Sequence, residues 1–183
     1  MYRVYLSLGS NIDQQRYLCA ALDALQAQFG ELMISPVYES EAVGFEGDNF
    51  YNLVVGVETD IAVGKLSSVL RSIEEDNDRT RSGSKFSSRT LDIDILTYGE
   101  QNGSVDGIEL PRDEILKYAF VLLPLADIAG DDLHPLSATS YRDLWHSFEH
   151  SDQPSINDQA RKQKLWRTPF EWCDRVISEP KDQ

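Results

Sequence analysis

The sequence LDIDIL, from Leu91 to Leu96, alternates apolar and acidic residues with a period of two. In a β-strand this spacing sends Leu91, Ile93 and Ile95 to one face and both aspartates to the other. Same-side neighbours in a strand lie about 7 Å apart, because the chain rises roughly 3.3 Å per residue. Strand interiors are depleted in Asp, so two carboxylates on one face predict a function for that face.

The charge just upstream makes the prediction more specific. Between positions 79 and 89 the chain carries four basic residues and no acidic residue: Arg79, Arg81, Lys85 and Arg89. Two neighbouring carboxylates repel each other, and a divalent cation relieves that repulsion. A basic segment beside a carboxylate pair suits a metal-bound polyphosphate, because carboxylates ligate Mg²⁺ and guanidinium groups bind phosphate oxygens. Taken separately, the basic run also fits a solvated loop, and the alternation fits an ordinary half-buried strand.

Composition limits the possible classes of protein. The chain has 183 residues, of which 41% are hydrophobic and 26% charged, as expected for one globular domain. Its net charge of −14 argues against a general nucleic-acid-binding protein. The sequence lacks the run of roughly 18 apolar residues that a membrane-spanning helix needs, and its start shows no signal peptide. Because the two cysteines occupy no metal-binding spacing, a reducing, cytoplasmic location is expected.

Hydrophobic periodicity predicts the element order β-α-β-β-α-β. The strands are expected over 2–8, 33–40, 50–59 and 91–96, and the helices over 14–29 and 60–76. Asn11 or Asp13 is expected to cap the first helix, Gly30 to end it, and Asp60 to cap the second. Pro36 marks the second strand as an edge or bulged strand. The order is typical of a ferredoxin-like α+β sandwich, a mainly antiparallel sheet with helices on one face and long loops around a ligand on the other.

The second half of the chain is less regular. We expect a hairpin tip at Asp106-Gly107, short helical pieces over 114–129 around Pro124, and a further helix over 140–148. We place the end of the domain at residue 150. The segment 151–183 mixes polar residues with Leu165 and three large aromatic residues, which indicates docking onto the domain or, alternatively, a surface for a partner.

Three segments carry a resemblance to a known family. They are YLSLGSN at 5–11, FYN at 50–52 and RTLDIDIL at 89–96. With these segments, residues 1 to 148 resemble the 6-hydroxymethyl-7,8-dihydropterin pyrophosphokinases, whose R-T-x-D-x-D motif is specific. The resemblance implies a ferredoxin-like fold and a monomer that acts on two small molecules, ATP and a reduced pterin. The implied reaction transfers pyrophosphate from ATP to the pterin hydroxymethyl group and releases AMP, as a step of folate biosynthesis.

The resemblance also implies residues for the metal and the nucleotide. Asp92 and Asp94 would hold two Mg²⁺ ions that bridge the triphosphate and the pterin hydroxyl, so that no protein nucleophile is needed. Arg79, Arg81 and Arg89 match family positions that act on the phosphates, the first two in a loop that would close over the nucleotide. Further nucleotide-binding positions are Arg71, Glu74, Phe86 and Arg112.

The pterin residues follow from the same resemblance. The family stacks the pterin ring between two aromatic side chains, and Phe50 and Phe120 occupy the matching positions. Asn52 matches the side chain that reads the pterin nitrogens. The rest of the ring edge would be read by the segment 40–44, at Ser40, Val43 and Gly44. Each residue also has an ordinary alternative, as a core aromatic or a strand-end hydrogen bond.

The chain departs from the best-known members at several positions. Ser87-Ser88 replaces a Gly-Pro pair, Phe86 a tryptophan and Phe50 a tyrosine. Arg112 stands in place of a phosphate-binding histidine, and we expect it to bind phosphate because a guanidinium is a permanent cation. Tyr118 stands where many members have an arginine. The changes at Arg112 and Tyr118 leave open a non-catalytic paralogue that binds pterin or nucleotide. Another two-metal phosphoryl or nucleotidyl transferase is a further alternative, against which the FYN strand argues.

The three histidines, His134, His146 and His150, are not expected to form a metal site with the acidic residues. For His134 the expected role is structural.

Overall fold

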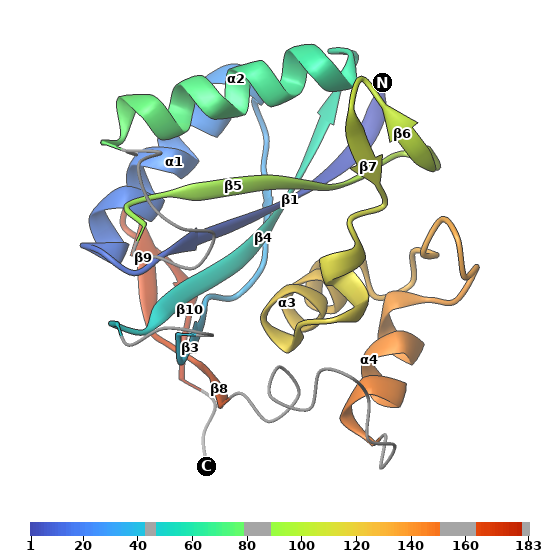
Figure 1. The fold of residues 1–183 in the computed structure, drawn as a ribbon. Helices are drawn as coiled ribbons and strands as arrows, with labels where there is room; N and C mark the ends of the chain where they lie inside the picture. The colour runs from blue at the N-terminus through green and yellow to red at the C-terminus, as the bar shows by residue number, and fades with distance from the viewer. Residues whose placement is uncertain (43–46, 79–88, 151–163, 181–183) are drawn as a thin grey trace.

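The computed structural model describes residues 1–42, 47–78, 89–150 and 164–180 (Figure 1). Its centre is a sheet of strand order β5-β1-β4-β3-β8, to which β2 is added through β4, and every pair in it is antiparallel. The strands of this sheet are β1 (Tyr2–Ser10), β2 (Met33–Ile34), β3 (Tyr38–Ser40), β4 (Phe50–Thr59), β5 (Asp92–Tyr98) and β8 (Leu165–Arg167). With the two helices that connect these strands, α1 (Gln14–Phe29) and α2 (Val63–Asp76), they reproduce the predicted β-α-β-β-α-β order.

The first core lies between the sheet and these two helices, which cover one of its faces (Figure 1). Ile93 and Ile95 of β5 are buried in this core, as the alternation predicts. They pack with every second residue of β1 and β4 and with the apolar stripes of the helices. Because the apolar residues of β5 occupy this face, Asp92 and Asp94 lie on the opposite one.

Of two more helices, the first packs on that opposite face of the sheet and the second packs on the first. They are α3 (Ala119–Ala129) and α4 (Tyr141–Glu149), and they form a second core with Tyr5, Val54 and Leu96 of the sheet. Leu96 lies on this face because the alternation of β5 continues from Asp92 and Asp94. The expectation of helices on one face therefore holds for α1 and α2. On the other face α3 covers part of the sheet and leaves the part that carries the aspartates uncovered. Among the described residues, no helix combines the length and hydropathy that a membrane crossing requires.

The predicted caps are correct at Gly30, correct in position but without a capping bond at Asp13, and wrong at Asp60. Gly30 ends α1 as predicted, with φ 81°, and donates its backbone N–H to Gln26 O at 2.8 Å. Asp13 occupies the N-cap position of α1 but makes no side-chain capping bond with the described residues. The N-cap of α2 is Ala62, and Asp60 instead forms an ion pair with the N-terminal amino group at 2.9 Å.

The predicted strand over 33–40 is divided into β2 and β3. The break falls at Ser35, Pro36 and Val37, where Pro36 cannot donate to a ladder. Ser35 keeps the segment attached to β4, because its Oγ accepts from Val54 N at 2.9 Å. The predicted irregularity at Pro36 is thus confirmed, but β3 is not an edge strand, because β8 pairs with it on the side away from β4.

A small hairpin follows β5, formed by β6 (Gly103–Val105) and β7 (Ile108–Leu110). Its tip is Asp106-Gly107, as predicted, and both residues have positive φ, of 52° and 79°. Asp106 Oδ2 accepts from Gly64 N at 2.9 Å, which joins the hairpin to the first turn of α2. After a 3₁₀ turn (Asp113–Leu116), Pro124 lies inside α3, so one helix replaces most of the predicted short pieces.

The described part of the C-terminal segment packs on the domain. Strand β8 pairs with β3, and β9 (Phe170–Trp172) forms a hairpin with β10 (Arg175–Ser178). Phe170 and Trp172 are buried in the first core, and Trp172 Nε1 donates to Asp23 Oδ1 of α1 at 2.7 Å. The domain boundary at residue 150 stays a prediction.

A buried histidine makes the stability of this fold depend on pH. His134 is 2% exposed, its Nδ1 accepts from the backbone N–H groups of Leu136 and Ser137 at 3.4 and 3.3 Å, and its ring lies edge-on to Tyr141. Burial lowers the pKa of His134 from its usual 6.5. The unfolded chain therefore takes up the proton first, so stability is lost as pH falls through about 6.5 towards the folded-state pKa.

We expect this loss in wild type and a smaller one in His134→Gln, which cannot titrate. Urea unfolding at pH 8 and pH 5.5 measures the difference, with His146→Gln on the exposed side of α4 as the matched control. Equal pH dependence in wild type and His134→Gln would contradict the assignment.

Candidate active site on the open face of the sheet

The register of three strands brings the predicted metal and pterin residues onto one surface. Gly9 of β1 lies opposite Asn52 of β4 on one side and opposite Asp92 of β5 on the other. Two residues earlier on the same face, Ser7 lies opposite Asp94. Neighbouring strands are about 4.8 Å apart, so Asn52 and Asp92 are roughly 10 Å apart across Gly9.

Gly9 keeps the floor of this surface flat. A Cβ at position 9 would lie 3.4 Å from Asn52 Oδ1 and 3.9 Å from Phe50 Cδ1. Any larger side chain there would therefore fill the space between the predicted pterin residues and the aspartates.

The pterin side of the surface is already ordered by hydrogen bonds. Ser40 of β3 lies opposite Phe50, and Asn52 Nδ2 donates to Ser40 Oγ at 3.0 Å and to Phe50 O at 3.4 Å. Asn52 and Ser40 are buried, so these bonds satisfy polar groups that would be costly to leave unpaired. Phe120 lies on α3, which packs against β4. Its ring stacks on the ring of Tyr118, with 5.1 Å between the ring centroids.

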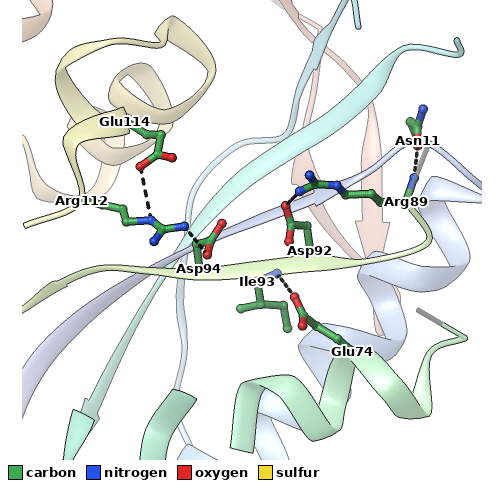
Figure 2. A network of polar contacts seen from close by, with 8 residues as sticks. All are labelled: Asn11, Glu74, Arg89, Asp92, Ile93, Asp94, Arg112 and Glu114. Carbon is green, nitrogen blue, oxygen red and sulfur yellow. Dashed lines mark hydrogen bonds and ion pairs between the residues drawn. The ribbon is translucent and has the colours of Figure 1, made fainter. Parts of the chain in front are cut away.

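On the metal side each aspartate has its own arginine (Figure 2). Arg89 Nη1 donates to Asp92 Oδ2, and Arg112 Nη2 donates to Asp94 Oδ1 at 2.6 Å. The aspartate side chains are 19% and 39% exposed, so the pair is half-buried at the surface. The predicted contact between the basic run and the aspartates thus occurs at Arg89, while Arg79, Arg81 and Lys85 lie outside the described residues.

Arg112 is also held by a second acid. Its Nε lies 3.3 Å from Glu114 Oε2 (Figure 2). Burial disfavours the charge of Arg112, but Asp94 and then Glu114 outweigh that effect and raise the pKa of the guanidinium. Arg112 therefore stays a cation, which is the property expected of a phosphate-binding group.

Asn11 positions Arg89, a role that the sequence did not indicate. Asn11 Oδ1 accepts from Arg89 N at 2.6 Å, and Asn11 N donates to Arg89 O at 3.1 Å. Asn11 is 1% exposed although it follows directly on a strand end. The signal for Asn11 in the sequence is its place at the end of the segment YLSLGSN, and its burial explains why it needs partners.

Glu74 lies on the buried side of α2. It is 4% exposed, and its Oε1 accepts from Ile93 N, between the two aspartates, at 2.8 Å (Figure 2). Glu74 therefore attaches α2 to the outer edge of β5. Its assignment to nucleotide binding stays a prediction.

A cleft of about 220 Å³ runs along this edge of β5. Arg71 and Glu74 line it from α2, Asp92 and Asp94 from β5, and Arg112 from the loop after β7. Three residues predicted for the nucleotide thus share one cleft with both predicted metal ligands. The remaining predicted residues, Val43, Gly44, Arg79, Arg81 and Phe86, lie outside the described part of the chain.

The donor set suits Mg²⁺. Two carboxylates on one strand face offer the hard oxygen ligands that this ion prefers. A carboxylate has about four acceptor positions, so Asp92 and Asp94 can ligate an ion while each also accepts from its arginine. The residues in this cleft therefore fit a complex of Mg²⁺ with an anionic phosphate chain.

The expectation for the histidines needs one correction. His146, Glu149 and His150 bring possible ligand atoms within 4.8 Å of one another on the exposed side of α4. The positions i, i+3 and i+4 share one face of a helix, which explains the grouping.

Comparison with known proteins identifies the family. The family model described as 7,8-dihydro-6-hydroxymethylpterin-pyrophosphokinase matches residues 5–130. A relative from Pseudomonas aeruginosa is 38% identical over 133 residues, which are 70% of this chain and 82% of the relative. One from Porphyromonas gingivalis is 37% identical over 142 residues, which are 74% of this chain and 96% of the relative. Both are named 2-amino-4-hydroxy-6-hydroxymethyldihydropteridine pyrophosphokinase.

Solved structures show the same fold. The Plasmodium falciparum HPPK-DHPS triple mutant with pteroate superposes with a TM-score of 0.68 at 16% identity, over 97% of this chain and 48% of the Plasmodium chain. The present chain thus spans about half the length of that solved structure, and the match confirms the predicted α+β fold. Because the family model spans residues 5–130 of 183 and close relatives match over most of their own length, the chain belongs to the 7,8-dihydro-6-hydroxymethylpterin-pyrophosphokinase family.

Proposed function

We propose that the chain transfers pyrophosphate from ATP to the hydroxymethyl group of 6-hydroxymethyl-7,8-dihydropterin, as a step of folate biosynthesis. The observation that carries this proposal is the single surface on which Asn52 and Asp92 lie on either side of Gly9. A pterin on Asn52 would point its hydroxymethyl group towards the carboxylates. A nucleotide in the cleft along β5 would bring its phosphates to the same carboxylates from the other side.

The reaction needs positioning more than covalent chemistry from the protein. The hydroxyl oxygen of the pterin attacks the β-phosphorus, the bond from that phosphorus to the oxygen of the α-phosphate breaks, and AMP leaves. The hydroxyl proton passes to solvent. Arg89 and Arg112 would bind phosphate oxygens and so neutralise charge on the transferring group.

Mg²⁺ is proposed as the metal, with Asp92 and Asp94 as its ligands and two ions expected. When bound, Mg²⁺ would lower the pKa of the pterin hydroxyl and screen the phosphates. The pterin ring would lie between Phe50 and Phe120. We further propose that the protein works as a cytoplasmic monomer.

One experiment tests the reaction. The protein is incubated with MgATP and 6-hydroxymethyl-7,8-dihydropterin, and the nucleotide products are separated by chromatography, with Asp94→Ala as the control. AMP formed only in the presence of pterin and only by the wild type supports the proposal. ADP or pyrophosphate as product would indicate another transferase, and pterin binding without any turnover would indicate a non-catalytic paralogue.

Arg112 should be the cation that replaces the usual histidine. Charge-assisted hydrogen bonds contribute about 1.5–3 kcal/mol, so Arg112→Ala is expected to raise the KM for ATP by about tenfold or more. Steady-state kinetics at saturating pterin measures this, with Arg142→Ala as control because Arg142 forms an exposed ion pair with Asp131. Unchanged nucleotide affinity and turnover in Arg112→Ala would show that the assignment is wrong.

A further inference from the structure

The C-terminal strand β8 lies against the edge of the sheet that carries the proposed pterin residues. It pairs with β3 so that Trp166 lies opposite Glu39 and Leu165 opposite Ser40. Trp166 is 40% exposed, and its Nε1 donates to Glu39 Oε2 at 3.1 Å. Side chains alternate along a strand, so Ser40 faces the site while Glu39 and Trp166 lie behind it.

Glu39 also accepts a hydrogen bond from Asn49, the residue that precedes β4. Its other oxygen, Oε1, accepts from Asn49 Nδ2 at 2.9 Å. Asn49 is the neighbour of Phe50, one of the two proposed stacking residues. The carboxylate of Glu39 therefore lies between a tryptophan of the C-terminal segment and the start of the strand that carries Phe50 and Asn52.

Residues 48 and 49 are also bonded by Gln14 at the start of α1 and by Asn11 just after β1. Asn49 O accepts from Gln14 Nε2 at 2.9 Å, and Asp48 O accepts from Asn11 Nδ2 at 3.2 Å. Asn11 is also the partner of Arg89, whose guanidinium binds Asp92. A continuous series of polar contacts thus runs from the C-terminal strand, through residues 48 and 49, to the metal side of the site.

We propose that Glu39 is a positioning residue, fixed by Trp166, and that the C-terminal strand through it sets the affinity for the pterin. The identity of the ligand rests on the proposed function. Hydrogen bonds to a carboxylate are the stronger kind, and a residue that is already fixed loses less freedom when the ligand binds. Without the bond from Trp166, Glu39 holds Asn49 less firmly, and Phe50 next to it is less ordered in the free protein. Phe50 then loses more conformational freedom when the pterin binds, which lowers the affinity for the pterin.

The test compares two tryptophans of the same segment. Trp166→Phe keeps a ring but loses the N–H that binds Glu39, whereas Trp172→Phe loses a similar bond, to Asp23, on α1. By calorimetry Trp166→Phe is expected to raise the Kd for the pterin about threefold to tenfold, and Trp172→Phe less than twofold. The KM for ATP should change less than twofold in both variants.

A double mutant separates positioning from general loss of structure. If Trp166 acts through Glu39, the double variant Glu39→Ala, Trp166→Phe should have the same pterin Kd as Glu39→Ala alone. Additive effects, or a parallel rise in the KM for ATP, would overturn the proposal.

Hydrogen exchange gives a readout that does not depend on the reaction. Amides of residues 48–52 should exchange faster in Trp166→Phe than in wild type and Trp172→Phe. If wild type binds no pterin and forms no AMP, the proposed function fails and exchange alone decides the positioning role. Unchanged exchange in Trp166→Phe would overturn that role, whatever the activity.

Discussion

Replacing Asp94 with asparagine is expected to lower the rate of AMP formation by about a thousandfold while the protein stays folded. Asparagine keeps the shape of the side chain and its ability to bond with Arg112, but it removes the charge that would hold Mg²⁺. Metal ions stabilise charge in such transition states by several kcal/mol, and each 1.36 kcal/mol corresponds to a factor of ten. Chromatographic measurement of AMP at saturating substrates determines the loss.

The stability of this variant should hardly change. The Asp94 side chain is 39% exposed and pairs with an arginine that has Glu114 as a second partner. Exposed ion pairs contribute about 0–1 kcal/mol, so the melting temperature is expected to stay within a few degrees. Asp113→Asn is the matched control, because Asp113 is an exposed acid that pairs with Lys117. More than a tenth of wild-type activity in Asp94→Asn would refute the role of Asp94 as a metal ligand.

The regular centre of the fold could be predicted because its patterns are long. In the sixteen residues of α1 the apolar positions recur over several turns, which indicates a helix. In β5 the alternating apolar positions correspond to burial, since Ile93 and Ile95 are buried. The C-terminal strands could not be predicted in this way. Strands β8 and β9 have three residues each, which is too short to show a period, and they form where β3 and the first core accept them.

The candidate site shows a similar division. The sequence indicates which residues have unusual chemistry, as at Asp92, Asp94 and Asn52, because such residues are out of place in strands. It does not indicate contacts between distant segments. Asn11 was expected only as a helix cap, and its bond to Arg89 spans 78 positions of the chain. Local patterns contain no information on such a pair.

Replacing Glu74 with alanine is expected to reduce the free energy of unfolding by about 1–3 kcal/mol and to impair catalysis as well. Among the strands of the described residues β5 is the last one of the sheet, so its outer N–H groups have no partner strand there. Glu74 supplies one acceptor for them, at Ile93 N. Without it this buried donor is left unsatisfied, which accounts for the expected loss. Urea unfolding measures the stability.

The effect on catalysis follows from the position of that bond. Ile93 lies between Asp92 and Asp94, so loosening its backbone displaces both carboxylates, and a shift of about 1 Å can cost a hundredfold in rate. Glu74→Gln keeps an acceptor oxygen and should retain more stability and activity than Glu74→Ala. Glu75→Ala, at the exposed neighbouring position of α2, should match wild type in both measurements. If Glu74→Ala were as stable and as active as Glu75→Ala, the edge of β5 would not depend on Glu74. The geometry of the aspartate pair would then have to be maintained by β1 and the two arginines.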